Sequence, residues 1–238
     1  LAILNAPGTS AFRHTRIEDG SDSTFAGRYF SGSLSTRSSD IEFLDGYIAR
    51  SHADDGIHIY ESRAHIARST FEDMGMDGID IDFGAEDSLF EKNVFLNSGG
   101  DSIDVSFTSM TIRENVVMGC KDKGISVGEV SQPIIEKHIT IGCAYGIAVK
   151  DKSRAHITDT LLLANDTGVG VYRKKPHFME GGYVFMKNSI VWGNKKPIEL
   201  DEFSTAEGVP PEDTRELALW KNKLPKEAFI YLETMLQK

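Results

Sequence analysis

The stretch Gly124-Ile125-Ser126-Val127 returns 22 residues later as Gly146-Ile147-Ala148-Val149. The same phrase, a small residue followed by an aliphatic, a variable and a second aliphatic residue, begins at positions 56, 78, 102, 124, 146 and 168. Successive copies are therefore 22 or 24 residues apart, and looser copies begin at Ser33 and, after a step of 29, at Pro197. A fixed period of this length is typical of a solenoid, in which copies of one unit stack on each other.

Two further apolar segments follow each copy of the phrase, about ten and about fifteen residues later. They are short, alternate apolar with polar residues and are rich in Ile and Val, which is typical of β-strands. Copies of one strand point the same way, so each is expected to pair in parallel with its copy in the next coil. The innermost row is predicted to contain Ile57, Ile79, Ile103, Ile125, Ile147, Val169 and Ile198.

A second row marks one corner of the coil, where amide side chains can hydrogen-bond along the stack and to the local backbone. Its predicted members are Asn93, Asn115, His138, Thr160 and Asn188. The period, the phrase and these corners resemble the right-handed parallel β-helix, the fold of pectate lyases and many envelope proteins. The resemblance covers about residues 33–200. It implies an all-β protein of about nine coils with three short strands each. The segments 146–151 and 172–176 also resemble a β-helix module of bacterial surface proteins.

The β-helix is expected to span residues 1–201, with loop insertions near 18–31 and 173–183. Residues 202–238 differ in composition and are predicted to form short helices over 215–222 and 226–237, the second with apolar residues at helical spacing. A solenoid leaves an apolar cross-section and unpaired strand edges at its end. We therefore expect this segment to cap the last coil, with docking of a partner as the alternative.

Composition excludes several classes of protein. The 26 Lys and Arg against 36 Asp and Glu give a net charge of −10, which argues against a general nucleic-acid binder. No apolar run approaches the ~18 residues of a membrane span. The chain starts at Leu1 without a charged and then apolar leader, so we expect it to be part of a longer protein.

Cys120 and Cys143 fall at nearly the same register of successive coils. They are expected to form either a disulfide or a stacked pair of buried thiols.

Three aspartates are predicted to share one patch on the outside of the solenoid. If Ile79 and Ile81 point inward, Asp80 and Asp82 point outward, and Asp104 lies beside Asp80 in the next coil, about 4.8 Å away. Carboxylates this close repel each other unless a cation lies between them, and Ca²⁺ prefers such oxygen ligands. The sequence therefore suggests a calcium site at these aspartates, with a solvated acidic surface as the alternative.

Toward the C-terminus the same face becomes basic, with Lys150 pointing outward and a basic loop after the next strand. Tyrosine rings can stack on sugars, and Lys or Arg can hold uronate carboxylates. We therefore predict that an acidic polysaccharide binds along this face. The candidate substrate-binding residues are His58, Tyr60, Ser106, Ser126, Glu129, Tyr172, Arg173 and Lys175.

The resemblance to pectate lyases further implies calcium-assisted β-elimination, in which Arg or Lys removes the proton next to the uronate carboxylate. Lys150 or Lys174 would then be the catalytic base, although coil spacing puts Lys150 about 10 Å beyond Ser106. A glycoside hydrolase using Asp80 and Asp104 is one alternative. A non-catalytic binding, adhesion or structural module of a larger surface protein is the other. In each case we expect a secreted or cell-envelope location.

Overall fold

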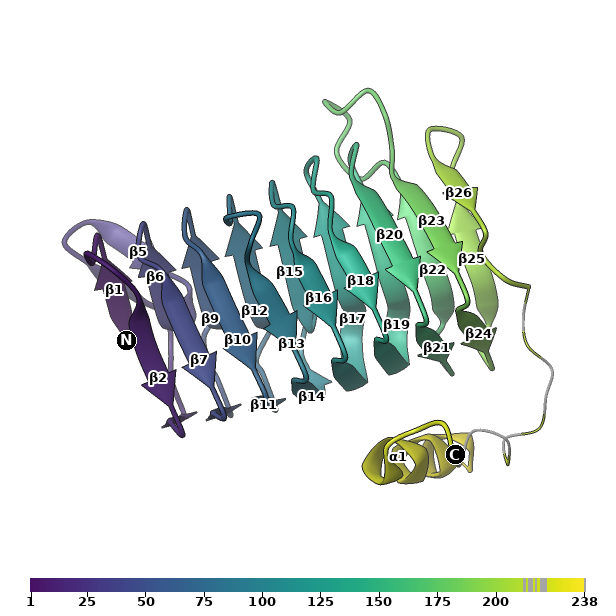
Figure 1. The fold of residues 1–238 in the computed structure, drawn as a ribbon, viewed down its shortest axis with the longest axis horizontal. Coiled ribbons are helices and arrows are strands. Elements are labelled where there is room, and N and C mark those ends of the chain that lie inside the picture. The colour runs from purple at the N-terminus through teal and green to yellow at the C-terminus, as the bar shows by residue number, and fades with distance from the viewer. Residues whose placement is uncertain (212, 214–215, 217, 219–221, 238) are drawn as a thin grey trace.

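A computed structural model describes residues 1–211, 213, 216, 218 and 222–237. The chain forms an all-β parallel solenoid of about eight turns, followed by one short C-terminal helix (Figure 1). The fold class predicted from the repeat is therefore confirmed. Within the described part of the chain, no helix is long and apolar enough to cross a membrane.

The coils present three faces, here called sheets 1, 2 and 3, in which every strand pairs in parallel with its copy in the next coil. Sheet 1 contains the repeated phrase: β1 (Ala2–Leu4), β6 (Gly32–Arg37), β9 (Asp55–Tyr60), β12 (Asp77–Asp82), β15 (Ile103–Ser106), the second halves of β17 (Val116–Gly128) and β19 (Ile139–Lys150), β22 (Thr167–Tyr172) and β25 (Lys196–Leu200).

Sheet 2 has nine strands: β2 (Ser10–Arg13), β7 (Ile41–Leu44), β10 (Ala64–Ala67), β13 (Leu89–Glu91), β16 (Thr111–Arg113), β18 (Ile134–Glu136), β20 (Arg154–Thr158), β23 (Tyr183–Lys187) and β26 (Thr205–Glu207). Sheet 3 is joined to sheet 1 through the first halves of β17 and β19, and its other strands are β3 (Arg16–Glu18), β8 (Tyr47–Ala49), β11 (Thr70–Glu72), β14 (Val94–Ser98), β21 (Leu161–Leu163) and β24 (Ile190–Trp192).

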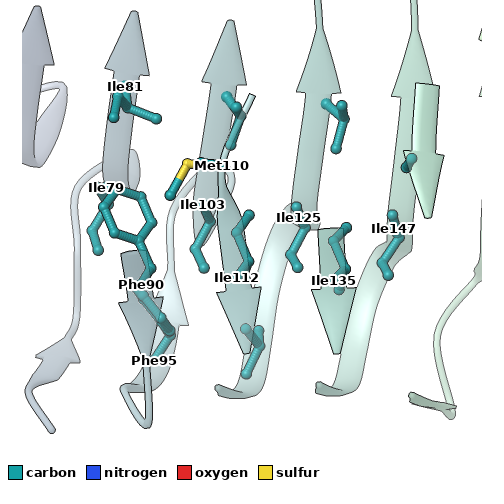
Figure 2. Packing of buried hydrophobic residues seen from close by; sticks show 14 of the residues in the cluster. Ile79, Ile81, Phe90, Phe95, Ile103, Met110, Ile112, Ile125, Ile135 and Ile147 are labelled. Atoms are coloured by element: carbon teal, nitrogen blue, oxygen red, sulfur yellow. The ribbon is translucent and has the colours of Figure 1, made fainter. Parts of the chain in front are cut away.

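The predicted innermost row exists in the predicted register. Ile79 pairs with Ile103, which pairs with Ile125, which in turn pairs with Ile147, and Figure 2 shows these side chains in one row inside the coils. All four are completely buried. The small first residue of the phrase has a steric reason: a Cβ at Gly78 would lie 2.5 Å from the carbonyl oxygen of Ser102 in the next coil. The phrase thus encodes both the core and the close approach of the coils.

The corner row is present over most of its length. Asn93 donates from Nδ2 to Asn115 Oδ1 at 3.0 Å, and His138 and Thr160 continue the row as fully buried residues. Burial lowers the pKa of His138 to about 3, so its ring is neutral at physiological pH. The prediction for Asn188 was wrong, because that residue is exposed and left-handed, with φ +52°. Its place is taken by Ser189, whose Oγ accepts the Thr160 N–H at 3.1 Å.

The C-terminal helix α1 (Lys226–Leu236) does not cap the last coil, so that part of the prediction was wrong. It lies along the outside of sheet 3, beside β17 and β19 (Figure 1), where Ala228, Phe229 and Leu232 pack against Met118 and Ile141. The physical reason is that from β14 to β24 sheet 3 is apolar on its outer as well as its inner face, and this apolar surface has to be covered. The other predicted helix, 215–222, falls largely outside the described residues.

Two segments depart from the regular coil, and one covalent bond joins neighbouring coils. Residues 18–31 contain an antiparallel hairpin, β4 (Ser23–Phe25) and β5 (Arg28–Phe30). Residues 173–182 form a loop between β22 and β23 that projects from one edge of the solenoid (Figure 1). Cys120 and Cys143 are joined by a disulfide, so the alternative of two stacked thiols was wrong.

Candidate functional site

The outer face of sheet 1 carries the predicted site residues. The strand register puts Asp80 directly between His58 and Asp104, and Asp104 next to Ser126. Asp82 lies two residues beyond Asp80 on β12 and therefore points to the same side. The three predicted calcium ligands thus lie together.

The structure groups these aspartates with other residues in two clusters. In the first, His58 Nε2 lies 3.8 Å from Asp80 Oδ2 and 3.7 Å from Asp82 Oδ2. In the second, one oxygen each from Asp77, Asp101 and Asp104 lie within 4.8 Å of one another. The carboxylate oxygens of the two clusters suit a hard cation such as Ca²⁺. We call the combined set the acidic patch; it consists of Asp55, Asp77, Asp80, Asp82, Asp101 and Asp104.

The sequence reasoning missed Asp55, Asp77 and Asp101. They occupy one register at the start of β9, at the start of β12 and just before β15, and they recur at the same 22- and 24-residue steps as the phrase, which is the signal that could have revealed them. Their carboxylates link the coils: Asp77 Oδ1 accepts the Asp101 N–H at 2.7 Å, and Asp101 Oδ1 accepts the Lys123 N–H at 2.8 Å. The row is therefore part of the scaffold as well as of the acidic patch.

Burial and repulsion by neighbouring charges raise the pKa of four carboxyl groups of the acidic patch, those of Asp55, Asp77, Asp80 and Asp101. Burial, with the charge of Asp101 adding to it, raises the pKa of Asp77 to about 8. Burial and then the charge of Asp104 hold the pKa of Asp80 well above its usual range. Burial raises the pKa of Asp55 to about 6. A cation bound here would compete with protons for these groups, because it stabilises the ionised carboxylates.

Beyond Asp104 lies a second group, the basic cluster, which consists of Ser106, Ser126, Glu129, Lys150 and Lys175. The buried Lys150 reaches back by one coil and donates from Nζ to Ser126 Oγ at 2.7 Å. Its side chain therefore spans much of the predicted 10 Å gap. Ser106 Oγ donates to Glu129 Oε2 at 2.5 Å, and Lys175 forms an ion pair with the same carboxylate. Burial of Glu129 opposes ionisation, but the hydrogen bonds from Lys175 and Ser106 lower the pKa of Glu129 below its usual value.

Three other predicted residues lie at the end of β22 and on the loop after it, where Tyr172 is the register partner of Lys150. Lys174 is exposed on the 173–182 loop. The guanidinium of Arg173 packs over the ring of Phe203, 3.4 Å from the centroid, and so faces the following coil. The ring of Tyr172 lies 6.0 Å from that of Tyr145, and burial raises the pKa of Tyr172 to about 12.

An aromatic ridge borders the acidic patch where the sheet 1 strands end. The rings of Phe83 and Phe107 stack at 4.5 Å, and the ring of Tyr60 meets Phe83 edge-on at 5.5 Å. Arg37 lies over Tyr60, 3.8 Å from the ring centroid. Both phenylalanines were missed, although each directly follows the last residue of a sheet 1 strand at the same register.

A model described as "right handed beta helix region" matches residues 55–207, more than half of the chain. The chain belongs to this right-handed β-helix family. In the β-helix, the matched range runs from the first residue of β9 to the last of β26 and so contains the acidic patch and the basic cluster. A search of curated proteins gives no significant match. The β-helix fold supports a carbohydrate-active enzyme or a binding module in general.

Proposed function

We propose that the outer face of sheet 1 binds an acidic polysaccharide through Ca²⁺ held at the acidic patch, and that Lys150 is the base that cleaves it by β-elimination. The observation that carries this proposal is the contact of Lys150 Nζ with Ser126 Oγ at 2.7 Å, because Ser126 is the direct neighbour of Asp104 in the sheet. A basic side chain thereby borders the carboxylates that would hold the cation.

Calcium held at the acidic patch would explain how a polyanion can bind to a protein with net charge −10. Calcium takes six to eight oxygen ligands, so an ion held by Asp80, Asp82 and Asp104 has positions left for a sugar carboxylate. His58 and Tyr60 lie on β9, the strand next to β12, and can contact the adjoining sugar. Lys175 is paired with Glu129 next to Ser106 and can attract a second carboxylate there.

In the reaction, the amine of Lys150 accepts the proton from the carbon next to the uronate carboxylate. The electron pair of that C–H bond forms the new C=C bond, and the bond to the glycosidic oxygen breaks. The leaving oxygen takes a proton from water, and the resulting hydroxide removes the proton from Lys150. One product chain therefore ends in an unsaturated sugar and the other in a free hydroxyl group. Bound calcium would supply the positive charge that stabilises the developing enolate. Lys150 is favoured over Lys174 because only Lys150 is held within the face.

The disulfide supports a location outside the reducing cytosol. Cys120 and Cys143 lie in neighbouring coils and are bonded, and such bonds persist mainly in secreted, periplasmic or surface proteins. We therefore propose a secreted or cell-envelope protein.

A glycoside hydrolase is the second candidate, because burial and the charge of Asp104 raise the pKa of Asp80, which favours its acid form, and Asp104 is its direct neighbour in the sheet. Hydrolysis of a glycosidic bond uses one carboxyl group as the acid and a second as base or nucleophile. This reaction leaves saturated sugars at both new ends, which distinguishes it from elimination.

The test incubates wild-type protein, Lys150→Ala and Asp80→Ala/Asp104→Ala with uronic-acid polymers, in calcium and in a chelator. The readouts are the ultraviolet absorbance of unsaturated uronates, the number of reducing ends and polymer binding. Lys187→Ala, an exposed lysine on sheet 2, is the control. We expect absorbance to rise only with calcium and to disappear in Lys150→Ala while binding is kept. New reducing ends without a rise in absorbance would favour the hydrolase. Polymer binding without turnover would favour a binding module. Absence of polymer binding would refute the proposal.

A further inference from the structure

The residue that follows each sheet 1 strand is exposed in most coils but buried in two, at Glu129 after β17 and at Asp151 after β19. Phe83 after β12 is 45% exposed and Phe107 after β15 is 44% exposed. Asp151 after β19 has the same left-handed backbone, with φ +52°, yet it is 0% exposed. Something covers this position in its coil, and the contacts identify the 173–182 loop.

The Asp151 carboxylate binds the start of that loop. Its Oδ1 accepts the backbone N–H groups of both Lys174, at 2.7 Å, and Lys175, at 2.8 Å. Its Oδ2 is buried, without a hydrogen-bond partner among the residues that the structure describes. Two backbone donors on one buried carboxylate oxygen form a strong anchor, because removal of the carboxylate would leave both N–H groups without a partner.

The end of the loop is held at the same corner. Lys152 donates its N–H to the Gly181 carbonyl at 2.7 Å. The chain then passes so close to β19 that a Cβ at Gly182 would lie 2.1 Å from the Val149 carbonyl oxygen, which explains the glycine. The ten residues 173–182 are therefore fastened at both ends to the exit of β19.

The anchored loop delivers Lys175 to Glu129, and Glu129 and Lys150 are both buried beside it. We propose that Asp151 is a positioning residue, which fixes the 173–182 loop as a wall of the polysaccharide groove and so places Lys175 beside Lys150. This inference rests on the proposed function for its ligand, a uronate polymer, but the anchoring itself can be measured without any ligand.

The experiment compares wild-type protein, Asp151→Ala and Asp151→Asn by amide hydrogen exchange and by trypsin cleavage after Arg173 and Lys174. Asp159→Ala is the matched control, since Asp159 follows β20 with φ +52° but is exposed. Exchange at residues 174 and 175 and cleavage in the loop should rise about tenfold or more in Asp151→Ala. Asp151→Asn keeps an acceptor oxygen and should restore most of the protection, whereas Asp159→Ala should match the wild type.

The second readout is binding of a uronic-acid polymer, with the calcium affinity and the unfolding temperature measured alongside. We expect Asp151→Ala to weaken polymer binding severalfold while calcium binding is unchanged. Wild-type rates of exchange and cleavage in Asp151→Ala would overturn the inference, as would wild-type polymer binding despite a released loop. If Asp151→Ala does not fold, the exchange of Asp151→Asn decides, and protection equal to the wild type then supports the acceptor role. Absence of polymer binding by the wild type would refute the proposed function but leave the exchange result readable.

Discussion

Replacing Asp77 by Asn should stabilise the protein at neutral and alkaline pH when no cation is present. Burial and the neighbouring charges raise the pKa of Asp77 from 3.8 to about 8 in the folded protein. The carboxyl group therefore has to keep a proton on folding that it has lost in the unfolded chain. An asparagine side chain has no proton to bind in this pH range, and its Oδ1 can still accept the Asp101 N–H that Asp77 binds at 2.7 Å.

The direction and size of this effect on stability follow from the raised pKa of Asp77. A raised folded-state pKa of an acid contributes stability that is complete below pH 3.8 and is lost as the pH rises to about 8. In that interval the loss is about 1.4 kcal/mol per pH unit, which amounts to on the order of 4 kcal/mol between pH 4 and pH 7. We therefore expect Asp77→Asn to be more stable than the wild type by about 2–4 kcal/mol at pH 7 and by close to zero at pH 4.

The assay is urea unfolding from pH 4 to pH 9 in a chelator, with Asp166→Asn as the control because Asp166 is an exposed residue paired with Lys195. The control should follow the wild-type curve. The reasoning is refuted if Asp77→Asn shows the same pH dependence as the wild type, or if it is less stable at every pH.

Three further outcomes follow from the packing. Ile125→Ala, a fully buried position in the innermost row, should lower the free energy of unfolding by about 2–5 kcal/mol; a loss below 1 kcal/mol would show that the row can collapse around a cavity. Replacing Cys120 and Cys143 by Ser should lower it by about 3 kcal/mol, since the bond spans 23 residues; equal unfolding curves for the oxidised wild type and the double variant would contradict this. Leu232→Asp should release α1 and expose it to trypsin while the circular dichroism of the solenoid is retained; a helix still protected would mean that other contacts hold it.

The repeat made the fold predictable, because every copy of it specifies the same strand register. Ile79, Ile103 and Ile125 each specify the same register, so an error at one coil is corrected by the next. The prediction of register is less accurate where an insertion interrupts the repeat. The 173–182 loop hides the true step between coils, and the corner row was consequently misplaced by one residue, at Asn188 instead of Ser189.

The candidate site was predictable only in outline. Strand alternation placed Asp80, Asp82 and Asp104 on one face. It could not show that Lys150 extends backward to Ser126, because coil spacing fixes Cα positions and not the direction of a long side chain. The site of α1 was also hidden, since sequence periodicity reports that a helix has an apolar face and not which surface that face covers.

The proposed function depends on the acidic patch being a cation site that serves a polyanion. Calorimetric titration of calcium into the wild type and into Asp80→Ala/Asp104→Ala, with and without a uronic-acid polymer, tests it most directly. We expect the wild type to bind calcium saturably and more tightly with the polymer present, and we expect no binding by the double variant. Absence of saturable binding, or binding equal in the two proteins, would contradict the proposal.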